Sequence, residues 1–477
     1  MYHLICRYIR KIPDSVVLGL IVLAYSFNVH AGVQQYSLEQ FITESISKFS
    51  DLKIAQFNVN RLAYDLDKAA SQLGWVLTAS GGYSRKASSF GIQSDAVDLD
   101  VGGRRLLESG HSISLSGKHE YNDSEQLLFG STPNPSDTTN LSLGYRIPLL
   151  KGEGNKAYLF SIEKAKIEKQ IALLSKNKVR EDLTLKLIDI FYAVSILDAR
   201  LNTSKKSLIR TKKLRHYIKN NINLGLLEKG EILQIDSQIF DLKLEQQRIL
   251  DLKEQQAISI NHFLEKPYNT NVEFVHESIG MDMLADDELV INNVINHNFD
   301  IKISKLQLGL LDTALSLSRD NEKSKLDLVM SVGAQRYAGT GATGSVDDID
   351  ATGMLRLEYE NALDKRTFSS ERLQIQIDRQ TNIEEQYRLN KDVEYEILGL
   401  MRNIDKLKKI VDLSKARNSN ENNKYVDILK RYKNGRSETN TVIQFDNERI
   451  RSELDYDTER FELDKRLKIL QLKQGLL

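Results

Sequence analysis

The feature that most constrains this chain is an internal repeat of helical hairpins. A long helical stretch that turns near Gly225 is followed, at a shift of 210 residues, by a second stretch that turns near Gly435. The two turns align without a gap, so that residues 232–236 fall on residues 442–446. A repeat of this size shows that one supersecondary unit is used twice, and it therefore has to be interpreted before any local motif.

Apolar residues in the first long arm have the spacing of a coiled coil. A period near 3.5 residues is typical of helices that pack along a seam, and not of strands. None of the five prolines of the sequence lies inside either hairpin, which matters because an interior proline costs a helix about 3 kcal/mol. The seam of the first arm, in steps of three and four, consists of Leu183, Leu187, Ile190, Val194, Leu197 and Leu201.

Helix lengths predict the architecture. The arms at 153–222 and 365–433 have about 70 residues each, which is ~105 Å at ~1.5 Å per residue. The other helical stretches are about half as long, so two of them end to end match one long arm. We therefore expect each long helix to pack beside a stacked pair of short ones, twice per chain. The short stretches are 37–73, 228–264, 287–320 and 439–473.

Residues 1–31 have the pattern of a secretory signal peptide. Three basic residues precede an apolar run at 16–27, and Ala31 ends a cleavage site of small residues. A membrane-spanning helix is the alternative, but it requires about 20 apolar residues, more than this run supplies. Cys6 is the one cysteine of the sequence and precedes the run, so we expect neither disulfides nor thiol chemistry in the exported chain.

Apolar and polar residues alternate with a period of two at 75–149 and again near 326–360. Such alternation predicts a sheet with one apolar and one polar face, either soluble or part of a transmembrane barrel. We favour the barrel, since closure lets strands persist in lipid. The additional strand pair of the first copy enlarges the barrel or folds outside or inside it. Candidate strands lie near 75–88, 96–103, 110–122, 139–149, 326–338 and 351–360.

Neither the charge nor the motifs point to nucleic acid, a cofactor or catalysis. The 66 basic and 66 acidic residues cancel, which gives no support for nucleic-acid binding. Gly152, Gly154 and Ala157 fit a dinucleotide-binding spacing, but the helix that follows has about 70 residues, too many for that ~30-residue unit. We interpret these glycines as the bend between strands and helix. No catalytic arrangement or metal site emerges, so we expect no enzyme, cofactor or metal.

Four segments, in this order, resemble those of the TolC-type outer-membrane efflux protein family over nearly the whole exported length. The segment 141–152, which contains Pro148 and Gly152, is similar to the strand-to-helix segment of the family. Residues 355–361 are similar to its equivalent in the second repeat, 431–437 to its periplasmic turn and 470–477 to its closing segment.

This resemblance implies a mostly α-helical fold with a membrane β portion. Long coiled-coil hairpins in two internal repeats would form a periplasmic tunnel, and the strands would contribute to a trimeric β-barrel in contact with outer-membrane lipid. It implies the outer-membrane channel of a tripartite efflux pump or a type I secretion system. The homotrimer would passively conduct substrate from a periplasmic adaptor and an inner-membrane pump or ABC exporter. A secreted coiled-coil structural or adhesive protein without a pore is the alternative.

The expected organisation follows the repeat. Pro267 and a polar run interrupt the helical pattern where the stacked short helices meet, which predicts a belt around the middle of the long arms. The segments are a signal peptide at 1–31, an N-terminal tunnel helix at 32–74, first-repeat strands at 75–150, the first hairpin at 151–264, an equatorial segment at 265–286, a tunnel helix at 287–322, second-repeat strands at 323–363 and the second hairpin at 364–477.

The resemblance further implies that the two turns form the closable periplasmic end of the tunnel. Some members close it with two aspartates after the turn glycine, where this sequence has Thr441 and Gln444. A carboxylate such as Glu231 or Glu438 in each turn would concentrate negative potential there; solvated turn acids are the alternative. The candidate gate residues are Gly225, Glu231, Gln234, Gly435, Glu438, Thr441, Gln444 and Asp446, and the candidate barrel-to-tunnel junction residues are Pro148, Gly152 and Gly154.

Overall fold

The computed structural model describes residues 34–87, 93–124, 134–276, 287–341 and 344–477, so the expected signal peptide lies outside them. The chain divides into two compact units. Within the described residues, every helix is too short or too polar to traverse a lipid bilayer. The first unit is formed by the segments up to Ser50, Arg180–Val290 and Ile397–Leu477, and the second by Asp51–Val179 and Ile291–Glu396.

The two hairpins expected from the repeat are present. Helix α4 spans Lys156–Asn223 and α8 spans Arg366–Lys433, with 68 residues each. Both their first and their last residues are 210 positions apart, so the repeat is preserved to the residue. The shorter return helices are α5, Glu231–Phe263, and α9, Thr439–Lys473.

Glycine ends both long helices in the same way. Gly225 has φ +73° and Gly435 has φ +71°, the left-handed region that residues with a Cβ adopt at a cost. In the first turn the amide of Gly225 donates to the carbonyl of Ile222 (3.0 Å), and that of Leu226 donates to Asn221 (2.9 Å). The turn at Gly435 repeats both bonds. This is the Schellman motif, which satisfies carbonyls that the helix end would leave unpaired.

The stretch 37–73, expected to form one helix, contains a break. Helices α2, Leu38–Lys48, and α3, Ser50–Ala70, are separated at Phe49, whose backbone is extended. Ser37 begins α2 with a capping box. The apolar spacing continues across the break, which is why the sequence pattern does not reveal it.

The stretch 287–320 is divided in the same way. Helix α6 spans Asp287–His297 and α7 spans Phe299–Asn321. Asn298 lies between them, and its side chain accepts a hydrogen bond from the amide of Ile301 (3.0 Å). A new N-cap of this kind starts a second helix instead of continuing the first.

A short parallel pair of strands organises the middle of the first unit. Strand β1, Gln34–Tyr36, pairs with β6, Val272–Phe274, in the segment expected to form the belt. The ring of Phe274 packs against Phe41 of α2 (centroids 5.0 Å apart) and Phe191 of α4 (4.8 Å). The part of the expected belt at 277–286 lies outside the described residues.

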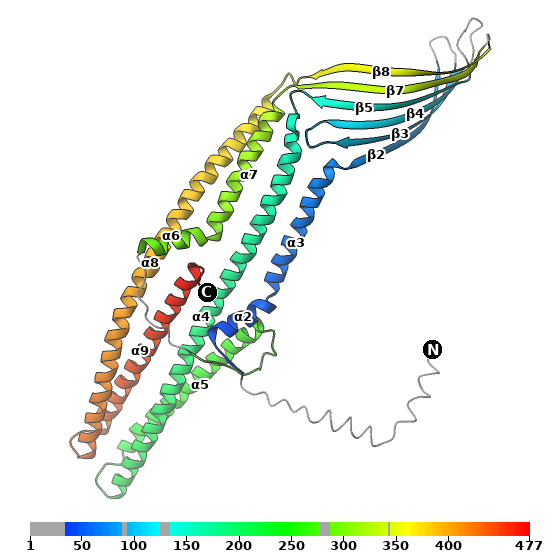
Figure 1. Ribbon diagram of the computed structural model, residues 1–477. Helices are drawn as coiled ribbons and strands as arrows, with labels where there is room; N and C mark the ends of the chain where they lie inside the picture. Colours follow the sequence, from blue (N-terminus) through cyan, green and yellow to red (C-terminus); the bar gives the residue numbers. More distant parts are fainter. Residues whose placement is uncertain (1–33, 88–92, 125–133, 277–286, 342–343) are drawn as a thin grey trace, which may run out of the picture. The chain divides into compact units, whose positions relative to one another are not determined.

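The second unit holds a single antiparallel sheet of six strands in the order β2-β3-β4-β5-β7-β8 (Figure 1). Strands of both repeats therefore share one sheet, joined where β5 pairs with β7. The additional pair of the first repeat belongs to this sheet. The strands are β2, Trp75–Ala87; β3, Gln93–Leu106; β4, Ser112–Ser124; β5, Ser136–Pro148; β7, Lys325–Gly341; and β8, Gly344–Glu360.

We predict that Gly435→Ala destabilises the hairpin by roughly 1–2 kcal/mol, because the substitution forces a Cβ into a left-handed conformation. An added Cβ at this position meets no atom within 4 Å, so backbone strain alone accounts for the loss. Thermal unfolding of the purified protein followed by circular dichroism measures it.

Gly230→Ala is the matched control for that substitution. Gly230 also has open space around an added Cβ, but its backbone is right-handed, with φ −64°. We expect no loss of stability there. Equal destabilisation by the two substitutions would contradict the assignment of the cost to the left-handed turn.

Candidate functional site

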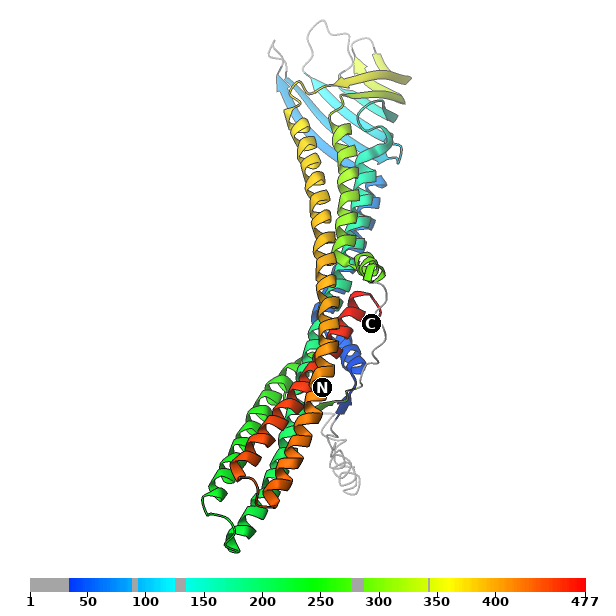
Figure 2. The same ribbon diagram turned by 90° about the vertical axis from the view of Figure 1, so that its left-hand side faces the viewer.

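The ends of the two hairpins share an apolar core in the first unit. Figure 2 shows the turn ends of α4 and α5 next to those of α8 and α9. All four helices contribute side chains, which brings the candidate gate residues of both repeats into one region. The buried members are Leu214 and Ile218 of α4, Ile235 of α5, Tyr425 and Tyr432 of α8, and Val442 of α9.

Glu231, the first residue of α5, is fixed by two hydroxyl groups of the second hairpin. Its carboxylate accepts hydrogen bonds from the hydroxyl of Thr439 and from that of Tyr432 (3.2 Å). The two hydroxyl oxygens are 2.7 Å apart, and both side chains are buried. Burial raises the pKa of Tyr432 to about 12, so at neutral pH its hydroxyl stays protonated and can donate. We call these three residues the Glu231 link.

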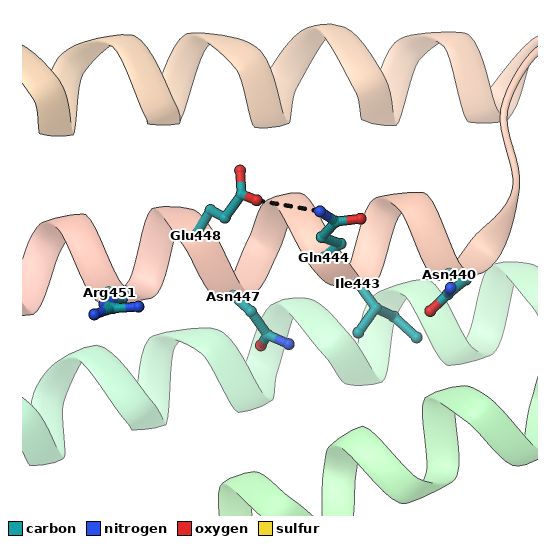
Figure 3. Close-up of a pocket in the computed structure, with 6 residues that line it drawn as sticks. All are labelled: Asn440, Ile443, Gln444, Asn447, Glu448 and Arg451. Carbon is teal, nitrogen blue, oxygen red and sulfur yellow. Dashed lines mark hydrogen bonds between the residues drawn. The ribbon is translucent and has the colours of Figure 1, made fainter.

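Most other candidate gate residues are accessible to solvent. Gln234 and Glu438 are exposed, and Thr441 is half-buried. Gln444 is exposed and lines a shallow groove of about 380 Å³ on α9 (Figure 3). Its amide donates to Glu448 of the same helix (3.3 Å). These side chains make no link between the hairpins comparable to that of Glu231.

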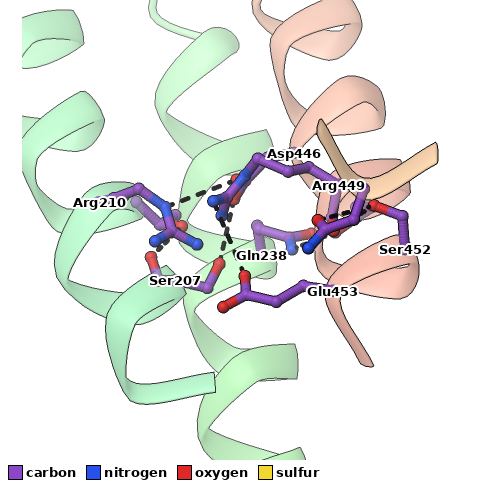
Figure 4. A network of polar contacts seen from close by, with 10 residues as sticks. Ser207, Arg210, Gln238, Asp446, Arg449, Ser452 and Glu453 are labelled. Carbon is purple, nitrogen blue, oxygen red and sulfur yellow. Dashed lines mark hydrogen bonds and ion pairs between the residues drawn. The ribbon is translucent and has the colours of Figure 1, made fainter. Parts of the chain in front are cut away.

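Asp446 is buried, with 6% of its surface exposed. Its carboxylate accepts hydrogen bonds from Ser207 of α4 (3.0 Å) and from the guanidinium Nη2 of Arg449 (3.0 Å). Nε of Arg210, also on α4, lies 3.7 Å from the carboxylate (Figure 4). The Asp446 network, as we call these four residues, therefore joins the second hairpin to the long helix of the first.

Burial raises the pKa of Asp446 above its usual value, although Arg210 and Ser207 act in the opposite direction. A raised pKa means that the folded chain binds this proton more readily than the unfolded chain does. Burying the charged form therefore lowers stability as pH rises from the unfolded value, near 4, through the raised one. Above that window the arginines are what offset the cost of the buried charge.

The equivalent residue of the first repeat, Asp236, has different surroundings. It pairs with Arg215 inside its own hairpin, with Nη2 of Arg215 3.0 Å from the carboxylate. The pair is partly exposed, and Arg215 lowers the pKa of Asp236. At the position equivalent to Arg215 the second repeat has Tyr425, whose ring lies 5.0 Å from the guanidinium of Arg449. The repeats therefore share a backbone but not this electrostatic arrangement.

The sequence analysis did not predict the partners of Glu231 and Asp446. Tyr432 lies three residues before the turn glycine, and this position next to a turn that occurs in both repeats offered a signal. Ser207 and Arg210 offered none, because Ser207 and Asp446 are 239 positions apart and no local pattern relates them.

The junction residues lie where β5 leads into α4 in the second unit. Pro148 ends the strand, and Gly152 and Gly154 have φ +90° and +68°. The amide of Gly152 donates to the carboxylate of Asp320 (2.8 Å), which is 3% exposed. The chain thus turns from strand to helix through two left-handed glycines, the first of which donates to a buried acid of α7.

The sheet has one apolar and one polar face. A row on the apolar face begins at Leu77 and continues through Gly103, Leu115, Leu143, Val332 and Gly353. The next row on the polar face begins at Thr78 and continues through Gly102, Ser116, Ser142, Gly333 and Thr352. Many large side chains of the apolar face are exposed, among them Leu77 at 80% and Leu355 at 73%.

Aromatic residues bound the apolar face along β2. Trp75 lies at the end next to α3 and Tyr83 toward the far end, and both are more than half exposed. Their separation is ~26 Å of strand at ~3.3 Å per residue. Outer-membrane barrels have an apolar band of about 25 Å between two aromatic girdles. The face has the dimensions of a surface that contacts lipid.

No protein-family model matches the chain, and no curated protein matches it significantly. Solved structures do match. The outer-membrane protein VceC of Vibrio cholerae superposes with a TM-score of 0.67 at 12% identity, over 92% of this chain and 96% of that one. The chain has the TolC-type outer-membrane channel fold.

Two further channels support this fold. The MtrE channel of Neisseria gonorrhoeae, solved in its open state, gives a TM-score of 0.63 at 13% identity, over 92% of this chain and 88% of that one. The CmeC channel of Campylobacter jejuni gives 0.59 at 13% identity, over 92% and 85%. The TolC-type fold expected from the sequence is therefore confirmed over almost the whole chain.

We predict that Asp446→Ala destabilises the first unit by ~3–5 kcal/mol, because it leaves the buried Arg449 with only the more distant carboxylate of Glu453, 3.9 Å from its Nη1, as an ionic partner. Asp236→Ala, at the equivalent position of the first repeat, should cost only a small fraction of that, since its pair with Arg215 is screened by water. Chemical denaturation of the two variants compares them. Equal losses would contradict the distinction between a buried and a solvated pair.

Proposed function

We propose that this protein is the outer-membrane channel of an efflux pump or a type I secretion system. Substrate would pass through it passively from the periplasm to the exterior, without catalysis. The observation that carries the proposal is the six-stranded sheet, which has an uncovered apolar face bounded by aromatics and a polar reverse face. In lipid, strands require a closed arrangement with apolar side chains outward and polar side chains toward water.

The proposal includes a homotrimer in which three copies share one β-barrel in the outer membrane and one helical tunnel in the periplasm. A six-stranded sheet does not close on itself around a water-filled channel, so several copies are required. A periplasmic adaptor and an inner-membrane pump or ABC exporter are the proposed partners, because a passive duct needs a source of energy elsewhere. The similarity to the VceC, MtrE and CmeC outer-membrane channels supports this assignment.

The hairpin turns are the proposed closable end of the duct. The Glu231 link ties the first hairpin to the second through Tyr432 and Thr439. For the hairpin ends to separate, both hydrogen bonds to the carboxylate must break. A hydrogen bond to a charged group contributes roughly 1.5–3 kcal/mol. The link is strong enough to favour a closed arrangement and weak enough to be released by a partner.

The experiment that tests the function is reconstitution of the purified protein into a planar lipid bilayer. We expect discrete single-channel currents, whereas a coiled-coil adhesive protein without a pore would give none. Tyr432→Phe removes one donor to Glu231 and should raise the fraction of time spent in higher-conductance states about tenfold, the equivalent of ~1.4 kcal/mol.

Glu438→Ala is the control for the gate. Glu438 is an exposed acid of the equivalent turn and is not part of the Glu231 link. We expect this substitution to alter cation preference at most, and to leave the open fraction unchanged. Glu231→Ala removes the acceptor of the link and should raise the open fraction. If Glu438→Ala raises the open fraction as much as Glu231→Ala does, closure depends on turn charge and not on the link.

A further inference from the structure

The two edges of the sheet have no partner strand among the described residues. Strand β2 has 13 residues and β8 has 17, and the outer side of each presents a row of backbone amides and carbonyls. Long unprotected edges of this kind pair with other strands. Inside a bilayer there is no water to satisfy such groups, so a partner for each edge is obligatory there.

One hairpin of the sheet has no counterpart in the other repeat. Shifting β5 by 210 residues places it at 346–358, inside β8, and the same shift makes β4 overlap β7. The β2–β3 hairpin is therefore additional. Its strand β3 pairs with β4 along almost all of its length, from Ser94 opposite Ser124 to Leu106 opposite Ser112.

The additional hairpin continues both faces of the sheet. Leu77, Val97 and Val101 lie on the apolar face with Leu115 of β4, and all four are exposed. The alternate residues of β3, including Asp98 and Asp100, lie on the polar face. If the hairpin packed over either face of the sheet, it would bury its apolar or its polar residues. It would then not need apolar and polar residues to alternate along its strands.

We propose that the β2–β3 hairpin is part of the barrel wall, and that β2 pairs with β8 of a neighbouring copy of this chain. The inference rests on the proposed function. Six strands from each of three copies make a wall of 18 strands. Barrels of about 16–18 strands leave an aqueous channel through their interior, and diameter grows roughly linearly with strand number. The additional hairpin thus widens the outlet.

The directions of the two edge strands suit this pairing. Strand β2 leaves α3, and β8 returns toward α8, so between neighbouring copies they are antiparallel, as are all strands within the sheet. Odd-numbered residues of both strands lie on the apolar face. Keeping the faces continuous therefore requires odd residues to oppose odd residues.

The apolar stretches fix the register further. On β2 the stretch runs from Trp75 to Tyr83 and is centred on Ala79, whereas on β8 it ends at Tyr359 and is centred near Leu355. Setting Ala79 opposite Leu355 also sets Trp75 opposite Tyr359. Cross-strand aromatic pairs are favourable.

The polar face supports the same register. With Ala79 opposite Leu355, Lys86 of β2 comes to lie opposite Asp348 of β8, and both side chains are exposed in the single chain. Opposite charges in directly opposed positions stabilise a strand pair. A neighbouring copy thus supplies the complementary charge for each edge.

A stagger between copies is also what barrel closure demands. Within one sheet the register aligns Trp75, through the intervening strands, with Leu355. Between copies the apolar stretches align Ala79 with Leu355, which is four residues further along β2. Tilted strands close into a barrel only with such a shift. The register that aligns the apolar stretches therefore also supplies the shift between copies that closure requires.

Disulfide trapping in outer-membrane fractions tests the pairing in the full chain. Cys6→Ser gives a cysteine-free background. Ala79→Cys is combined in turn with Gly353→Cys, Leu355→Cys and Leu357→Cys, which covers the register and its nearest alternatives on the same face. We expect Ala79→Cys with Leu355→Cys to give dimer and trimer bands that disappear on reduction.

Such bands report contacts between copies, because β3, β4, β5 and β7 separate the two edges of one chain by on the order of 20 Å. The matched control is Ala79→Cys with Arg356→Cys, whose side chain lies on the opposite face. It should give no crosslink. Equal crosslinking by this control would overturn the register argument.

A second pair of cysteine substitutions distinguishes a failure of this inference from a failure of the proposed function on which it rests. If β2–β3 lies outside the wall, β4 becomes the edge, and Leu115→Cys should crosslink to Leu355→Cys of the neighbour. Trimers on native gels with that crosslink, and none from Ala79→Cys, would overturn the inference alone. A protein that remains monomeric in membranes would overturn both the inference and the proposed homotrimer.

Discussion

The antiparallel pairing of β5 with β7 is the interaction on which the rest of the second unit depends. It runs from Ser136 opposite Gly339 to Pro148 opposite Asp327 and joins the strands of one repeat to those of the other. Because β5 leads into α4 and β7 follows α7, the register of this pair fixes where helices of both repeats leave the sheet. At that end, Nη1 of Arg146 lies 2.6 Å from Asp327, so an ion pair reinforces the same junction.

The two repeats keep one backbone and differ in chemistry. Both long helices have 68 residues and both end at a left-handed glycine. The side chains then diverge, since Asp236 makes a solvated pair within its hairpin and Asp446 a buried network across hairpins. The side chains of the two repeats can diverge because helix length and turn geometry require only apolar spacing and a turn glycine. The positions left over are free to specialise.

The low sequence identity to channels of the same fold has a related explanation. Coiled-coil seams require apolar residues at intervals, and two-faced strands require alternation, but neither requires particular residues. Agreement over 92% of the chain at 12% identity is what such constraints permit. Specific contacts, such as that of Glu231 with Tyr432 and Thr439, do require particular residues. Those residues have to fit the packing of this one chain.

The sequence by itself determined the elements whose causes are local. Apolar periodicity located the long arms and the strands, and glycine located the turns, because neighbouring residues encode both. Only the tertiary structure decided the order of the strands, the placement of β2–β3 in the common sheet, the break at Phe49, and the burial of Asp446. These features depend on which segments pack together, over as many as 239 positions for Ser207 and Asp446, and such packing produces no periodic pattern in either segment.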